Sequence, residues 1–170
     1  MRLVLAAALL ALPLAACDDG KPGTSISINA GDDDGNTTAH VDGATGTASL
    51  KTPVFSGSLK LPRMHLTADN FDMNGVHLYP GSTISGLNVE ARDNKDTDDR
   101  DSGIVHVRFE SPADPATVRD WFADKLNHAG FSVTPSGNGL TGTTDEKKPF
   151  RLDLKPADNG HAAGEITING

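Results

Sequence analysis

The sequence predicts an α+β protein that is mostly β and has two modules behind an apolar leader. Apolar side chains two residues apart, between Gly and Pro turns, predict a β-rich module over residues 25–91, either solenoid-like or a meander. One amphipathic helical stretch within residues 104–170, with alternating segments on both sides, predicts a βαβββ antiparallel sheet with one helix. An acidic linker at residues 92–103 divides the two modules.

The chain begins with a short apolar run behind one positive charge. Arg2 is followed by 14 residues without a charged side chain, Leu3 to Ala16. As a helix this run is about 21 Å long, which is too short for the roughly 30 Å core of a bilayer. Residues 1–16 are therefore predicted to be a secretory signal peptide.

The residues Leu14, Ala15, Ala16 and Cys17 resemble the lipobox of bacterial lipoproteins. The resemblance implies that a signal peptidase recognises Leu14, Ala15 and Ala16 and cuts before Cys17, whose thiol carries a diacylglyceryl group. Cys17 is the only cysteine, so no intramolecular disulfide competes for it. Two other interpretations stay open: an ordinary secretory signal followed by an unrelated cysteine, and an uncleaved anchor.

Residues 17–24 are expected to form the lipidated N-terminus and a polar tether that lifts the body off the membrane. A lipid on Cys17 would hold the protein at a membrane surface without a spanning helix. The resemblance therefore implies a bacterial cell-envelope protein that faces the periplasm. Asp18 resembles the inner-membrane retention signal of enteric bacteria, which favours the inner membrane and leaves the outer membrane open.

The composition excludes some partners. The 170 residues carry a formal charge of −8 and contain no basic block, which argues against nucleic acid and against electrostatic attraction to anionic lipid. Aromatic residues make up only 5% of the chain, so the core is expected to be aliphatic. The expected partners are the membrane, through Cys17, and an envelope protein; the oligomeric state stays open.

Within residues 25–91 the apolar positions alternate in short runs. Ile26 and Ile28 alternate with serines, and the turn formers of residues 31–36 end that run. Further apolar pairs predict strands of only a few residues: Leu59 and Leu61, Met64 and Leu66, Phe71 and Met73, Val76 and Leu78, Leu87 and Val89. Such short strands bury little alone, so each is expected to lie against a neighbour.

Residues 104–110 alternate as a half-buried strand, and a helix follows them. Asp114 is a suitable N-cap, Pro115 suits the first helical position and Gly130 ends the helix. Three strands are expected after the helix, the first folded back at residues 135–139. This half resembles small α+β modules of exported bacterial lipoproteins, and the whole chain is similar to uncharacterised envelope lipoproteins of Gram-negative bacteria.

The apolar stripe of this helix contains Trp121 and Phe122. Both side chains are expected in the core, with an exposed partner site as the alternative. As a core residue, Trp121 is expected to cost about 3–5 kcal/mol when it is replaced by Ala.

No metal motif is complete. Asp32, Asp34 and Asn36 have the spacing that opens an EF-hand calcium loop, but Thr37 and Gly43 stand where that loop needs Gly and Glu. The acidic run of residues 93–101 could also hold a divalent ion, and a solvated linker is the other interpretation. The histidines form no zinc motif: His40, His65, His77, His106, His128 and His161.

No catalytic residue and no cofactor is predicted, because the chain lacks a GxSxG nucleophile elbow and a phosphate-binding GK[ST] loop. The expected function is that of a lipid-anchored, non-catalytic binding or structural module, with contacts made by strand edges and the polar sheet face. The alternative is a metal-dependent binding protein or a hydrolase whose site is assembled from loops of both modules.

Overall fold

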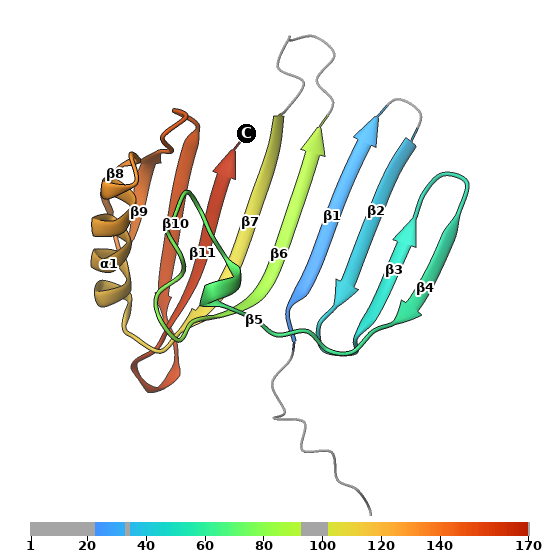
Figure 1. Ribbon diagram of the computed structural model, residues 1–170, viewed down its shortest axis with the longest axis horizontal. Coiled ribbons are helices and arrows are strands. Elements are labelled where there is room, and N and C mark those ends of the chain that lie inside the picture. The colour runs from blue at the N-terminus through green and yellow to red at the C-terminus, as the bar shows by residue number, and fades with distance from the viewer. Residues whose placement is uncertain (1–22, 33–34, 93–101, 170) are drawn as a thin grey trace, which may run out of the picture.

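The computed structural model describes residues 23–32, 35–92 and 102–169. These residues form one mixed sheet of 11 strands and a single α-helix (Figure 1). The fold class expected from the sequence, α+β and mostly β, is confirmed. The strand order across the sheet is β4-β3-β2-β1-β6-β7-β11-β10-β9-β8, and β5 pairs with β6 beside this path.

Helix α1 (Pro115–His128) lies between the seventh and eighth strands in the chain. The strands are β1 (Ser25–Asp32), β2 (Gly35–Asp42), β3 (Thr47–Lys51), β4 (Ser56–Lys60), β5 (Leu66–Thr67), β6 (Thr83–Arg92), β7 (Ser102–Ser111), β8 (Ser132–Ser136), β9 (Gly139–Thr143), β10 (Pro149–Pro156) and β11 (Ala162–Asn169). Every pairing in the sheet is antiparallel except that of β1 with β6.

The first four strands form a meander, and two of them are longer than the sequence led us to expect. β1 and β2 each contain 8 residues. Small side chains extend the alternation where no large apolar residue marks it: Ala39 pairs with Ile28, and Ala48 pairs with Val41. The meander joins the rest of the sheet through the parallel pairing of Ile26 with Leu87.

Residues 68–81 alternate like a strand in the sequence but form an irregular segment. It begins with a 3₁₀ turn at Ala68–Asn70 and contains one isolated bridge between Met73 and Val76. Asn74 and Gly75 both have positive φ, 53° and 80°, which closes a tight turn between the bridged residues. The apolar side chains of this segment are buried against the sheet instead of pairing along it.

Helix α1 lies where the sequence predicted it. The Asp114 side chain accepts hydrogen bonds from the backbone N–H groups of Ala116 and Thr117, and Pro115 is the first helical residue. The Thr117 hydroxyl, which also donates to Asp114, holds the pKa of that carboxyl below its usual range. Gly130, with φ of 90°, turns the chain after the helix. Four strands follow, because the first expected one is a complete hairpin, β8 and β9.

The acidic stretch joins neighbours in one sheet. Residues 93–101, the interior of the expected linker, lie outside the described residues. The strands on either side, β6 and β7, pair with each other from Thr83 with Glu110 to Arg92 with Ser102. The charged run therefore connects two strands that pair with each other as a hairpin. The sheet is continuous through both of the modules that the sequence suggested.

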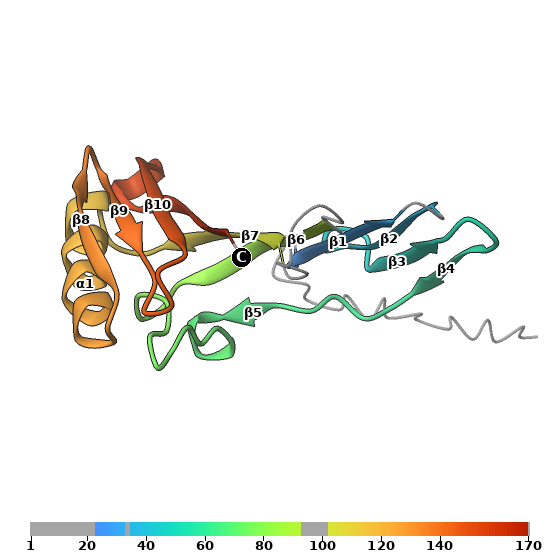
Figure 2. The ribbon, with the colours of Figure 1, turned by 90° about the horizontal axis from the view of Figure 1, so that it is seen from above.

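The core lies on one side of the C-terminal half of the sheet. Helix α1 and residues 66–82 cover strands β6 to β11 there, and Figure 2 shows both beside the twisted C-terminal strands. The largest fully buried side chains are Phe109, Phe122, Phe150, Leu78, Leu126, Leu140, Leu152 and Ile166. Trp121 is only half-buried, with its ring 5.9 Å from that of Tyr79 and 5.0 Å from that of Phe122.

Thr24, expected at the end of the tether, is buried and connects three segments. Its hydroxyl donates to the Ile84 carbonyl at 2.5 Å and accepts from the Leu66 N–H at 3.0 Å. Its own N–H donates to the Met64 carbonyl. The start of β1 is thereby fastened to β5 and β6.

Replacing Thr24 by Val is expected to destabilise the protein by about 1–3 kcal/mol, because it removes the hydroxyl's hydrogen bonds to the Ile84 carbonyl and from the Leu66 N–H in a buried place. Urea unfolding measures the loss. Thr24→Ser keeps the hydroxyl and is the matched control, so equal midpoints for the Ser and Val variants would contradict the role of these two hydrogen bonds.

Candidate functional site

An apolar face of the sheet is uncovered over β1–β4. Residues paired across neighbouring strands point to the same side, so the register defines two rows of side chains. One row is Ile26, Val41, Ala48 and Leu59, and the other is Ile28, Ala39, Leu50 and Gly57. With Phe55, these residues form what we call the uncovered apolar face.

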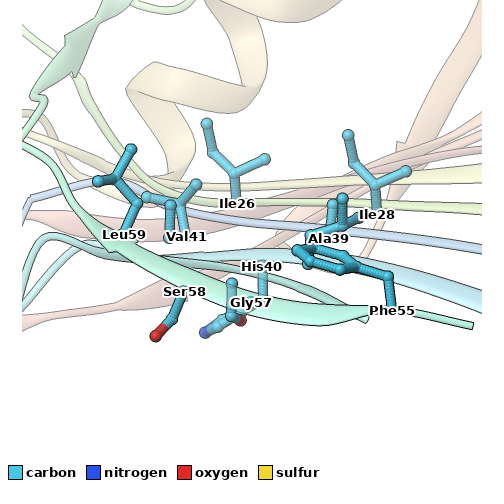
Figure 3. A pocket seen from close by; sticks show the side chains of 12 residues that line it. Ile26, Ile28, Ala39, His40, Val41, Phe55, Gly57, Ser58 and Leu59 are labelled. Atoms are coloured by element: carbon cyan, nitrogen blue, oxygen red, sulfur yellow. The ribbon is translucent and has the colours of Figure 1, made fainter. Parts of the chain in front are cut away.

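The uncovered apolar face is exposed to solvent to a degree that is unusual for large apolar side chains. Exposed fractions are 43% for Ile28, 41% for Leu50, 59% for Phe55 and 64% for Leu59. Together they line a shallow hollow of about 500 Å³. Figure 3 shows Ile26, Ile28, Val41 and Leu59 rising on one side of the sheet, while His40 and Ser58 point to the other.

Phe55 extends the face beyond the strands. The turn before β4 is closed by the Thr52 N–H, which donates to the Phe55 carbonyl at 2.7 Å, and by the Thr52 hydroxyl, which accepts from the Phe55 N–H. The ring then lies over Gly57, where a Cβ would come within 2.8 Å of it. The glycine therefore gives the aromatic ring room to lie against the strand.

The uncovered apolar face is the continuation of the core face. Ile26 pairs with Leu87 on β6, Leu87 with Val107 on β7, and Val107 with Ile166 on β11. Val107 and Ile166 are fully buried in the core beneath α1. One apolar surface therefore runs across the sheet, covered at one end and bare at the other.

The opposite face of the sheet is polar. At its centre, His106 Nδ1 lies 3.1 Å from Glu165 Oε1 and 3.2 Å from Thr167 Oγ1. Asn88, which pairs with His106 across the strands, donates to Glu90 at 3.3 Å. The His106 contacts connect β7 with β11, and the Asn88 hydrogen bond lies within β6.

A second hollow, of about 510 Å³, lies farther along the polar face and has charged walls. Arg151 Nε and Nη2 donate to the two oxygens of Asp153, at 2.6 and 2.7 Å. This hydrogen bonding from Arg151 lowers the pKa of Asp153 and raises that of Arg151. Charged side chains of both signs line the hollow: Arg108, Glu110, Arg151, Asp153, Lys155 and Glu165.

Several residues singled out in the sequence lie outside the described ranges. Leu14, Ala15, Ala16 and Cys17 precede residue 23, as does most of the expected tether. Of the calcium-like run, Asp34 lies outside the described residues, and Asn36 is exposed in β2.

The histidines are spread over the molecule. His77 Nδ1 lies 2.8 Å from the Phe71 carbonyl oxygen, and His128 Nδ1 lies 2.7 Å from that of Asp124. His40, His65 and His161 are exposed. Among the described residues, no three His, Cys, Asp or Glu side chains come together in a way that could hold a metal ion.

No protein-family model, curated protein sequence or solved structure matches the chain. Within residues 23–32, 35–92 and 102–169, no helix is long and apolar enough to cross a membrane.

The sequence contains a signal for the uncovered apolar face. Apolar alternation extends over most of residues 26–89, yet the part of the chain that the structure describes contains a single α-helix. An α-helix is about 10–12 Å wide, whereas ten strands spaced about 4.8 Å apart span more than 40 Å. One helix cannot cover such a sheet, so an exposed apolar surface follows from the count of elements.

Proposed function

We propose that this chain is a lipid-anchored protein of the bacterial cell envelope that works as a non-catalytic binding or structural module. The uncovered apolar face of β1–β4 is the observation that carries the proposal. Exposed contiguous apolar surface in a folded protein marks an interaction site. Four strands contribute to it, and neither of its two rows contains a charged side chain.

The apolar face is a stronger candidate for the contacts than the strand edges and the polar face. On the polar face, His106 contacts Glu165 and Arg151 is paired with Asp153, so these groups already have partners within the molecule. The apolar side chains of β1–β4 are instead left exposed to water. Covering them with a partner stabilises the complex by about 25 cal/mol per Å² of apolar surface buried.

The lipobox resemblance supports the anchor. A lipid on Cys17 would place the module a few residues from the membrane, since Thr24 is already fixed to the folded body. We infer that Leu14, Ala15 and Ala16 are read by the signal peptidase and that the module faces the periplasm, with Asp18 favouring the inner membrane.

The anchor is tested by fractionating cells that express the full chain or Cys17→Ser. The full chain is expected in the membrane fraction, resistant to extraction with high salt, because two or more acyl chains anchor stably whereas a charge-based attachment dissociates in salt. Cys17→Ser is expected in the soluble fraction of the envelope. Membrane retention of Cys17→Ser would contradict lipid anchoring.

The binding role is tested with a photo-reactive amino acid placed at position 50, on the uncovered apolar face. Position 49, which has the same strand and the opposite face, is the matched control. Adducts from position 50 and none from position 49 are expected in intact cells. Equal labelling from both positions would refute the apolar face as the contact surface.

A further inference from the structure

We propose that the uncovered apolar face is covered by a second copy of this chain, related by a two-fold axis that runs along the strands above β2 and β3. The inference rests on the proposed function, because it names the partner of the same face. Two features of the structure lead to it, a step in the molecule and the pattern of large and small side chains, and a third, the size of the face, determines how strong the contact is.

The first feature is a step. Helix α1 and residues 66–82 stand on the same side of the sheet as the uncovered apolar face, because one apolar surface continues from Ile26 through Val107 to Ile166. Figure 3 shows the helix on the side to which Ile26 and Ile28 point. The uncovered face is therefore a recess one layer deep, bounded by the covered half and open beyond β4.

The step excludes a flat partner. A helix is about 10–12 Å thick, so a bilayer surface that touched α1 would remain about one layer away from Leu50 and Ile28. To reach those residues, it would also have to bury the outer side of α1, where Asp120, Asp124 and Lys125 are exposed. A lipid surface is therefore a poor occupant of the recess.

A second copy has the shape that the recess needs. Packed sheets lie about 10 Å apart, which is close to the thickness of the helical layer. A two-fold axis along the strands places the bare half of one copy on the bare half of the other. The covered half of each copy then lies beyond the β4 edge of its partner, so the complex has two layers throughout.

The second feature is the pattern of side chains on the face. In one row, Ala48 lies between Val41 and Leu59; in the other, Ala39 lies between Ile28 and Leu50. Each row thus has a small alanine between two large side chains. Side chains from two such faces interdigitate in sheet packing, and a surface with both ridges and gaps can be complementary to itself, as a two-fold interface requires.

The third feature is the size of the face. Four strands about 4.8 Å apart, with five paired residues each, make a face of roughly 19 by 17 Å. Two such faces together have a flat area of about 650 Å², which is below the range of about 1,200–2,000 Å² for stable interfaces. The dimer is therefore weak between free molecules and strong between copies held on one membrane by Cys17, where the local concentration is high.

The test is cross-linking in membranes with a short bismaleimide, because facing Cα atoms in sheets about 10 Å apart are too far from one another for a disulfide. A lipid blocks the thiol of Cys17, so an introduced cysteine is the only free thiol. Ala39→Cys and Ala48→Cys lie close to the proposed axis, and Ser49→Cys, on the opposite face of β3, is the control. After treatment with the bismaleimide, Ala39→Cys and Ala48→Cys are expected to give several-fold more covalent dimer than Ser49→Cys. Adding Leu50→Asp to Ala39→Cys is expected to abolish the dimer.

Two outcomes would overturn the proposal. One is equal dimer yield from Ala39→Cys and Ser49→Cys, which would indicate random collision. The other is monomer alone from both face positions in protein that resists protease like the parent. If the photo-reactive residue at position 50 then captured a different envelope protein, the second copy would be excluded while the proposed binding function of the face would stand. If position 50 captured nothing, both would fail.

Discussion

Replacing Phe122 by Ala is expected to lower the free energy of unfolding by about 3–5 kcal/mol. Phe122 has an exposed fraction of 0% and is the aromatic side chain through which α1 reaches the sheet. Its ring centroid lies 6.0 Å from that of Phe109 on β7 and 5.0 Å from that of Trp121. Truncation leaves a cavity between the helix and the sheet. The side chains that line the cavity are packed against other core residues, so they cannot move in to fill it.

Urea unfolding of the Phe122 variant measures this loss, read as a shift of the midpoint at unchanged slope. Lys125→Ala, an exposed change on the same helix, is expected to stay within about 0.5 kcal/mol of the parent. Trp121→Ala is expected to cost less than Phe122→Ala, which corrects the expectation from the sequence, because the Trp121 ring is only half-buried. A larger loss for Trp121→Ala would mean that α1 is held by a different contact.

Replacing Gly164 by Val is expected to cost about 1–3 kcal/mol, by crowding and not by loss of contact. Gly164 on β11 pairs directly with Phe109 on β7. A Cβ at Gly164 would lie 2.2 Å from Phe109 Cζ, far inside any real contact. The ring has little room to move, because Phe109 is buried and lies against Phe122.

A double-mutant cycle separates this crowding from a backbone effect. Phe109→Leu alone is expected to destabilise through the lost ring, and combining it with Gly164→Val is expected to cost less than the sum of the two single changes. Urea midpoints for the four proteins give the coupling energy. Strictly additive losses would show that the ring does not limit the side chain at position 164.

The parts of the fold that could be predicted are those defined by local physics. Asp114 and Pro115 at the start and Gly130 at the end delimit α1, since caps depend on residues within one turn. Phe150, Leu152 and Leu154 alternate with polar residues along β10, and the structure buries all three. These signals need no knowledge of what the segment packs against.

The parts that could not be predicted depend on distant partners. The parallel pairing of β1 with β6 joins residues about sixty positions apart, for example Ile26 with Leu87, and alternation carries no information on which strands meet. The residues 93–101 look like an inter-domain linker because they are charged, yet a long hairpin loop has the same composition. Residues 71–78 alternate because their apolar side chains fill gaps in a core layer. A strand would show the same alternation, so the sequence does not distinguish the two structures.

The candidate site could have been inferred from the sequence only by comparing the number of apolar strands with the number of helices available to cover them. In the sequence, the candidate residues look like ordinary inward-facing strand residues: Ile26, Ile28, Val41 and Leu50. The exposure emerges when the number of covering elements is compared with the number of strands, and the register then places these side chains on one face.

The unequal layering of the sheet also determines how the molecule opens. The hydrogen bonds of β7, β10 and β11 break only when the core beneath α1 is lost, because these strands carry fully buried side chains such as Phe109, Leu152 and Ile166. Strands β2 to β4 are held by in-plane hydrogen bonds and by little buried area, so they can separate in a partial unfolding event that leaves the C-terminal half intact. Within the described residues, the segment that would contact a partner is thus also the one that opens most easily. A bound partner raises the free energy needed to separate those three strands by its own binding free energy.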